Sequence, residues 1–232
     1  MRRSRRYQGA ATLVPPETAL GIDEALEKLK TGATAKFDET AEATLVLGIR
    51  PSQVVVRGTV NLPHGTGKAV RVLAFAKGDS VTEAEQAGAD LVGADEYIEK
   101  IKEGWLEFDT VIATPDMMKD VGRLGKILGP RGLMPNPKTG TVTNDIAKAV
   151  SESKAGKIEY RTDKTANVHA PVGKASFEAD NLMDNLREIA REIVRARPAA
   201  AKGNYIRNVT ICTTMGPGVD VDISSLVDST RS

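Results

Sequence analysis

The stretch LGPRGLMPNPKTGTV, residues 128–142, combines residue types that suit contact with phosphate groups. It contains three glycines, three prolines and two cations, Arg131 and Lys138, and it contains no acid. Arginine and lysine donate charge-assisted hydrogen bonds to phosphate oxygens, and prolines stiffen the backbone so that less entropy is lost on binding. A purely structural connector accounts for the same composition equally well.

A second stretch, TTMGPGVDV at residues 213–221, suits contact with a sugar-phosphate chain. Thr213 and Thr214 supply hydroxyl groups, and Met215 supplies an unbranched thioether. Gly216 lets the backbone approach a ligand closely. From these residues alone, an ordinary strand end followed by a turn is the better interpretation.

The sequence shows no catalytic constellation. The Gly-Lys pair at 67–68 fails as a phosphate loop, because Leu62 stands where the first glycine belongs and Ala69 where the Ser/Thr belongs. Cys212 is interpreted as a buried small apolar residue, and His169 lies in a predicted strand with no obvious acid partner. With one cysteine and two histidines, neither a disulfide nor a metal-ligand spacing exists. We therefore expect no enzymatic activity, no cofactor and no metal site.

Charges are segregated along a chain whose net charge is only +1. Residues 79–109 carry ten acids against two lysines, whereas the first ten residues contain four arginines and no acid. A further basic set lies within residues 154–174. Separated basic patches suit a protein that meets a polyanion on selected surfaces, although solvated helix faces would give the same pattern.

Length and composition exclude several classes of protein. The 232 residues allow one large or two modest domains, and 41% hydrophobic with 27% charged residues is typical of a globular protein. The apolar runs are too short to cross a bilayer, and no apolar segment of a secretory signal follows the basic N-terminus. We expect a cytoplasmic protein without a membrane partner.

The periodicity of apolar residues changes along the chain. Residues 22–30 have helical spacing, and residues 36–49 alternate with period two, which indicates a half-buried strand and places Phe37 on its core face. From residue 69, short apolar strands alternate with helices, which predicts parallel strand pairing. After residue 156 the chain returns to hairpin-like strands, followed by a helix over 179–197.

These patterns predict an α/β protein with two domains. Residues 1–66 and 157–232 are expected to form a discontinuous α+β domain, because their half-exposed strands can pair with one another in one mixed or antiparallel sheet. Residues 67–156 are expected to form an inserted Rossmann-like three-layer α/β domain. The two crossings between the domains lie beside glycines, which predicts a hinge; these are Gly65, Gly67 and Gly156.

Five motifs together resemble the bacterial form of large-subunit ribosomal protein one, the family of the ribosome's mobile side stalk. They are NLPHGTGK, GRLGKILGPRGLMPNPKTGTV, AGKIEYRTDK, HAPVGK and TTMGPGV. The resemblance implies an RNA-binding protein without enzymatic activity, located in the cytoplasmic large ribosomal subunit beside its other components. It also implies three RNA partners: 23S rRNA of the side stalk, E-site tRNA whose release the stalk assists, and the mRNA of its own operon, whose translation the free protein represses.

The resemblance also implies which residues contact RNA. The rRNA-binding residues would be Lys36, Phe37, Thr40, His169, Lys174, Thr213, Thr214, Met215 and Gly216. The composition of the 128–142 loop, rather than the resemblance, leads us to expect a secondary RNA contact at Arg131 and Lys138. Two segments depart from the family: residues 49–57 lack its usual charged middle, and the N-terminal arginines match it only in charge.

Two other functions stay open at this point. One is a nucleotide-using enzyme built on the α/β insert, since such folds bind ligands at strand ends, although fold alone does not establish chemistry. The other is a DNA-compaction protein, which would bind duplex DNA and folded RNA with similar affinity because charge attraction is nearly indifferent to shape.

Overall fold

The computed structural model describes residues 3–14, 18–51, 54–199 and 201–227 of a mixed α/β protein. The chain divides into two compact units. One comprises residues 1–67 and 158–232, and the other comprises residues 68–157. None of the described helices has the length and apolar content needed to cross a bilayer.

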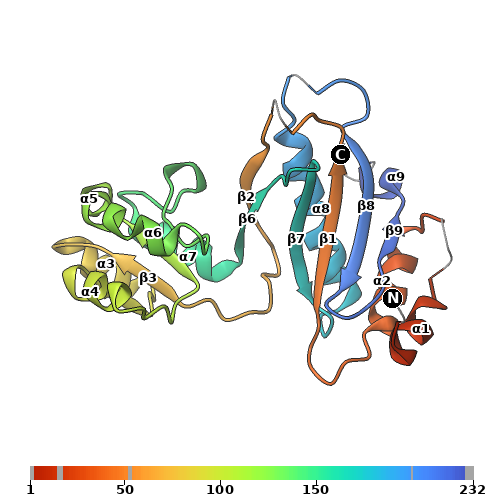
Figure 1. The fold of residues 1–232 in the computed structure, drawn as a ribbon, viewed down its shortest axis with the longest axis horizontal. Helices are drawn as coiled ribbons and strands as arrows, with labels where there is room; N and C mark the ends of the chain where they lie inside the picture. Colours follow the sequence, from red (N-terminus) through yellow and green to blue (C-terminus); the bar gives the residue numbers. More distant parts are fainter. Residues whose placement is uncertain (1–2, 15–17, 52–53, 200, 228–232) are drawn as a thin grey trace. The chain divides into compact units, whose positions relative to one another are not determined.

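The unit that contains both chain ends is built on a four-stranded antiparallel sheet of order β7-β1-β8-β9 (Figure 1). Its strands are β1 (Thr40–Leu47), β7 (Asn167–Lys174), β8 (Ile206–Thr213) and β9 (Val219–Val221). Strand β1 lies between β7 and β8 and pairs with both. A segment from the first third of the sequence is therefore held between two segments from the last third.

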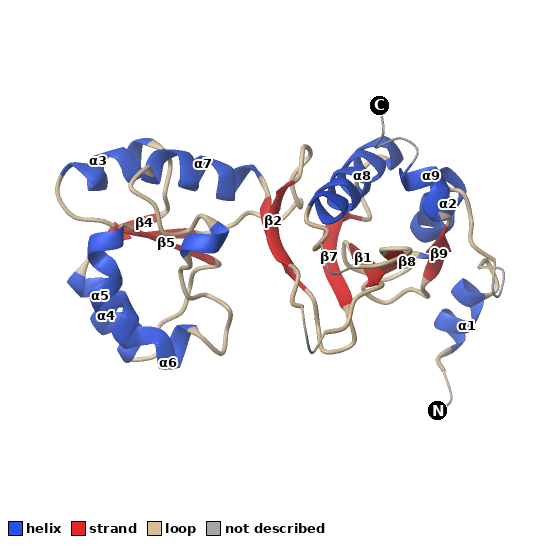
Figure 2. Ribbon diagram, turned by 90° about the horizontal axis from the view of Figure 1, so that it is seen from above, coloured by secondary structure: helices blue, strands red, loops and turns tan. Residues whose placement is uncertain are grey.

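One face of this sheet is covered by two helices, α2 (Ile22–Gly32) and α8 (Ala179–Arg195), as Figure 2 shows. The short helices α1 (Arg5–Ala11) and α9 (Ile223–Val227) belong to the same unit. The covered face of β1 carries side chains that are at most 2% exposed, and these are Ala41, Ala43, Leu45 and Leu47. The predicted period-two stripe is confirmed, because burying alternate residues on one face is what a strand does.

Two expectations about this unit are wrong. Strand β1 begins at Thr40 rather than at residue 36. Phe37 therefore lies outside the strand, where the alternation of buried and exposed side chains does not hold, and it is 54% exposed. The strands also form two sheets rather than one, since β2 (Arg57–Asn61) pairs with β6 (Lys157–Arg161). Beyond the end of β6, one antiparallel bridge between Thr162 and Val168 connects the chain to β7, while the Thr162 backbone N–H and hydroxyl both donate to Val56 O.

The second unit contains a three-stranded parallel sheet of order β4-β3-β5. Its strands are β3 (Val72–Phe75), β4 (Leu91–Gly93) and β5 (Thr110–Ala113). Helices α3 (Asp79–Gln86) and α7 (Ile146–Ala155) lie on one face, and the other face is covered by α4 (Asp95–Lys102), α5 (Met118–Val121) and α6 (Gly125–Leu128) (Figure 2). Alternate residues of β3 enter the two apolar clusters, so the sheet is buried on both faces.

Candidate nucleic-acid interface

Three strand ends meet at one end of the four-stranded sheet. Because β7 and β8 both run antiparallel to β1, the start of β1 lies beside the ends of its two neighbours. Thr40 is opposite Lys174, and Ala41 is opposite both Gly173 and Thr213. Residues separated by more than 130 positions in sequence are thereby brought together.

Thr40 is bonded to both neighbouring strands. The Lys174 Nζ donates to Thr40 Oγ1 at 3.0 Å. The Thr40 backbone N–H donates to Thr214 Oγ1 at 3.0 Å, and the Thr214 N–H donates back to Thr40 O at 3.0 Å. Thr40, Thr214 and Lys174 therefore form one connected group at the sheet end.

A buried carboxylate lies beneath this group. Glu39 is only 2% exposed, and its two oxygens accept from the backbone N–H groups of Ala35 and Met215, each at 2.9 Å. Burial by itself raises the pKa of Glu39, but the hydrogen bonds from Ala35 and Met215 outweigh it, so the pKa lies below the usual value. Glu39 fixes the loop over 35–39 and the turn at Met215 to each other. Sequence reasoning missed this residue.

Two large apolar side chains remain exposed beside the group. Phe37 on the 35–39 loop is 54% exposed, and Met215 is 49% exposed. Lys36 is also exposed on that loop. Neighbouring Asp38 is tied to Ser176, whose N–H and hydroxyl donate to its carboxylate at 3.2 and 2.8 Å. Cations and hydroxyls beside exposed apolar groups match the donors and the stacking surfaces that RNA-binding sites use.

The turn after β8 depends on a glycine. Thr213 is buried, with 3% of its side chain exposed, whereas Thr214 is exposed. A Cβ atom on Gly216 would overlap the Thr213 Oγ1 atom, and the Gly216 N–H donates to Thr213 O at 3.1 Å. Thr213 and Gly216 therefore support the turn that presents Thr214 and Met215. We call the group formed by Lys36, Phe37, Thr40, Lys174, Thr214, Met215 and Gly216 the clamp surface.

His169 lies away from the clamp surface. It is five residues from Lys174 along β7, which corresponds to about 17 Å of strand. Its Nδ1 is 3.1 Å from Thr44 Oγ1, and its Nε2 is 3.6 Å from Asp163 Oδ2. The expectation that His169 has no acid partner is therefore wrong. Hydrogen bonds from the Asn167 N–H and from Thr165 lower the pKa of Asp163 to about 2, so this carboxylate is ionised at neutral pH.

The burial of Cys212 also differs from the expectation that this residue is buried. It lies on the face of β8 opposite the helices and is half-buried rather than fully buried. Partial burial raises the pKa of its thiol, with the charge of Glu42 on the paired position of β1 acting in the same direction. A thiol with a raised pKa is poorly suited to be a nucleophile.

Arg131 and Lys138 lie in the other unit, on the loop that follows α6. Leu133 and Met134 anchor this loop by packing against the unit's core, while Arg131 and Lys138 are exposed. Asn136 caps the short 3₁₀ helix Pro137–Thr139 by accepting from the Lys138 N–H at 2.9 Å. The loop therefore has a defined backbone that presents two cations to solvent.

The clamp surface combines cations, hydroxyls and exposed apolar side chains at one sheet end, which are the groups that nucleic-acid-binding proteins use. A sequence model of the ribosomal protein L1p/L10e family matches residues 29–217. The chain belongs to this family. It is accordingly a structural protein of the large ribosomal subunit in the cytoplasm that binds rRNA, and it is not an enzyme. Membership of this family excludes the two alternative functions, a nucleotide-using enzyme and a DNA-compaction protein.

Proposed function

We propose that the clamp surface binds the 23S rRNA of the large subunit's mobile side stalk. In this proposal, residues 1–66 and 157–232 are the rRNA-binding domain and residues 67–156 are an inserted domain. Lys36 and Lys174 neutralise phosphates, and Thr214 bonds to phosphate oxygens or 2′-hydroxyls. Phe37 and Met215 contact sugars or bases, while the buried Thr213 and Gly216 hold the turn.

One observation carries this proposal. Thr40, Thr214 and Lys174 are joined by hydrogen bonds of 3.0 Å, and Phe37 and Met215 remain exposed beside them. Exposed large apolar side chains on a fixed backbone lose little entropy when bases or sugars cover them. His169 lies further along β7, so we propose that it contacts a more distant part of the same RNA.

We further propose two roles that involve other RNAs. The same surface binds the mRNA of the protein's own operon and so represses its translation. Arg131 and Lys138 contact the E-site tRNA or neighbouring RNA and assist tRNA release. The backbone at Gly65, Gly67 and Gly156 has φ values of 65°, 71° and 108°, which favour glycine. We propose that the chain bends beside these residues, after Gly65 on the first crossing, because Asn185 holds the Gly65 carbonyl.

The rRNA proposal is tested by measuring the affinity of the full chain for a side-stalk RNA and for a scrambled RNA of equal length at one salt concentration. Thr214→Val and Met215→Ala should each weaken stalk binding about tenfold, as expected when a hydrogen bond or a stacked contact is lost. Thr31→Val on the exposed face of α2 is the matched control and should bind like the parent. If both clamp variants bind stalk RNA like the parent, the assignment is wrong.

A further inference from the structure

A second cationic site lies at the opposite end of the four-stranded sheet. Strand β1 leaves the clamp surface at Thr40 and ends at Leu47, which is paired with Ile206 at the start of β8. Seven residues of extended strand separate the two ends by about 24 Å. A ligand at the far end therefore does not compete for the clamp residues.

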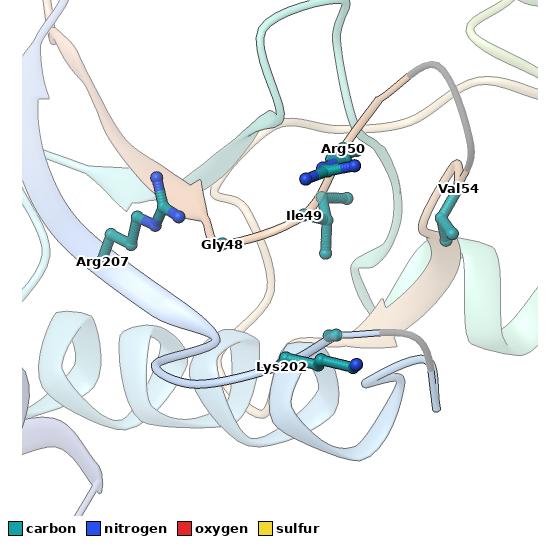
Figure 3. Close-up of a pocket in the computed structure, with 7 residues that line it drawn as sticks. Gly48, Ile49, Arg50, Val54, Lys202 and Arg207 are labelled. Carbon is teal, nitrogen blue, oxygen red and sulfur yellow. The ribbon is translucent and has the colours of Figure 1, made fainter.

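The far end contains a hollow with a volume of about 380 Å³. The described residues that line it include three cations and no carboxylate, and they are Gly48, Ile49, Arg50, Val54, Ala201, Lys202 and Arg207. Arg50 follows β1, whereas Lys202 and Arg207 come from the loop before β8 and from β8 itself (Figure 3). Among the described residues, no side chain forms an ion pair with any of the three.

Unpaired cations around one hollow repel one another, and a bound anion would relieve that repulsion. Arginine guanidinium groups match the geometry of phosphate oxygens with two parallel hydrogen bonds. The charge of the hollow therefore points to a phosphate-bearing ligand.

The backbone around the hollow is held in place. Arg197 Nη2 donates to Ala201 O and Gly203 O, both at 3.0 Å, and the Arg197 guanidinium lies 5.7 Å from the centre of the Tyr205 ring. The Gly48 N–H donates to Tyr205 O at 2.7 Å. These bonds hold the loop over 201–205 against the end of β1, so less entropy is lost from this part of the site on binding.

Gly48 makes room for one of the cations. A Cβ at this position would overlap Asn204 O and would lie 3.2 Å from Arg207 Nε. Without a side chain at Gly48, Arg207 lies over the end of β1 and faces the hollow (Figure 3).

We propose that this hollow binds a nucleoside diphosphate. Its volume falls within the range of small-molecule sites, roughly 300–1,000 Å³. Ile49, Val54 and Ala201 give it an apolar wall against which a base or ribose can pack, while the three cations hold the two phosphates. A continuous RNA strand would instead be expected to follow cations spread along a groove, and here they surround one hollow.

The test is calorimetric titration of the full chain with three probes at low salt. ADP should bind, inorganic pyrophosphate should bind more weakly because it lacks the base and ribose, and adenosine should show no binding. Raising the salt concentration should weaken ADP binding because the interaction is between charges. Equal binding of ADP and adenosine, or no ADP binding at millimolar concentration, would overturn the proposal.

Variants separate this site from the clamp surface. The double variant Arg50→Gln, Arg207→Gln should weaken ADP binding about tenfold or more, since it removes two charged donors. Its affinity for stalk RNA should equal that of the parent. Lys102→Gln, which removes an exposed cation in the last turn of α4, is the matched control and should bind ADP normally. Unchanged ADP affinity in the double variant would contradict the proposal, and so would weakened RNA affinity without ADP binding, which would assign these cations to RNA.

Discussion

Glu39 has a positioning role at the clamp surface. Its side chain is 2% exposed and is not available to a ligand. It accepts hydrogen bonds from the backbone N–H groups of Ala35, in the loop that carries Phe37, and of Met215, in the turn after β8. The two N–H donors bond to different oxygens of Glu39, and an amide side chain has only one such acceptor atom. The placement of Phe37 and Met215 therefore depends on a residue that does not touch RNA.

Replacing Glu39 by glutamine should separate these effects. In Glu39→Gln the new NH₂ group faces either the Ala35 or the Met215 N–H, and one buried donor loses its partner. We expect the free energy of unfolding, measured in urea, to fall by about 1–3 kcal/mol. Stalk RNA affinity should fall as well, because the turn at Met215 is no longer fixed. Glu42→Gln, at an exposed position of the same strand, is the control, and equal effects of the two changes would contradict this role.

The lowered pKa of Glu39 predicts a pH dependence. A carboxyl group whose folded pKa lies below its unfolded value stabilises the fold fully above the unfolded pKa, and that stabilisation is lost as pH falls through the folded pKa. The unfolding free energies of the parent and Glu39→Gln should therefore differ most near neutral pH and converge below the usual value of 4.5. Urea unfolding of both chains at several pH values between 3 and 7 measures this, and a constant difference would contradict it.

At the scale of elements, helix α8 fixes the segment that leads out of the first unit. Asn185 on this helix is fully buried and accepts a hydrogen bond from the His64 N–H at 3.1 Å. Its Nδ2 donates to Gly65 O at 3.0 Å and to Val172 O at 2.7 Å. One side chain thereby joins the 64–65 segment to strand β7.

Asn185→Ala should leave three backbone groups without their partner, one of them buried and two partly buried. We expect the free energy of unfolding to decrease by about 2–4 kcal/mol, more than one lost hydrogen bond would cost. Asn181→Ala, a half-buried asparagine in the same helix, is the control and should change stability much less. Thermal and urea unfolding of both variants measure the difference, and equal stability would show that the Asn185 bonds contribute little.

Local patterns predicted the regular elements well and the irregular ones poorly. The alternation in β1 and the helical spacing of apolar residues in α2 were visible because each repeats over several residues. Phe37 was assigned to the core because the alternation of buried and exposed residues was assumed to begin at residue 36, before the first residue of β1. The roles of Glu39 and Asn185 depend on partners more than 100 positions away along the chain, Met215 for Glu39 and Gly65 for Asn185, so a local pattern does not reveal them. The β2–β6 pairing was missed for the same reason.

The chemistry of the clamp surface was only partly visible in the sequence. Lys174, Thr214 and Met215 were identified through resemblance to a family, whereas composition alone favoured an ordinary strand end. The register between β1, β7 and β8 explains why these residues belong together, since Thr40 is opposite Lys174 and bonded to Thr214. Register is a property of the folded sheet that single-sequence patterns do not specify.

At the scale of the whole molecule, we expect one unit to bind stalk RNA and the other to assist tRNA release. Arg131 and Lys138 lie in the unit of residues 68–157, while the clamp surface lies in the other. The double variant Arg131→Ala, Lys138→Ala should leave stalk RNA affinity close to that of the parent and should slow tRNA release from the E site of assembled ribosomes. Lys100→Ala, Lys102→Ala in the same unit is the matched control. Unchanged tRNA release in the first variant would remove this role.

The central claim is that the two ends of the chain fold together into the RNA-binding surface. It is tested most directly by a chain in which a short Gly-Ser linker replaces residues 67–156, with its folding checked by circular dichroism. Its affinities for side-stalk RNA and for scrambled RNA are then compared at one salt concentration. We predict that the shortened chain folds and prefers the stalk RNA as the full chain does. A folded shortened chain that binds the two RNAs equally would contradict the account.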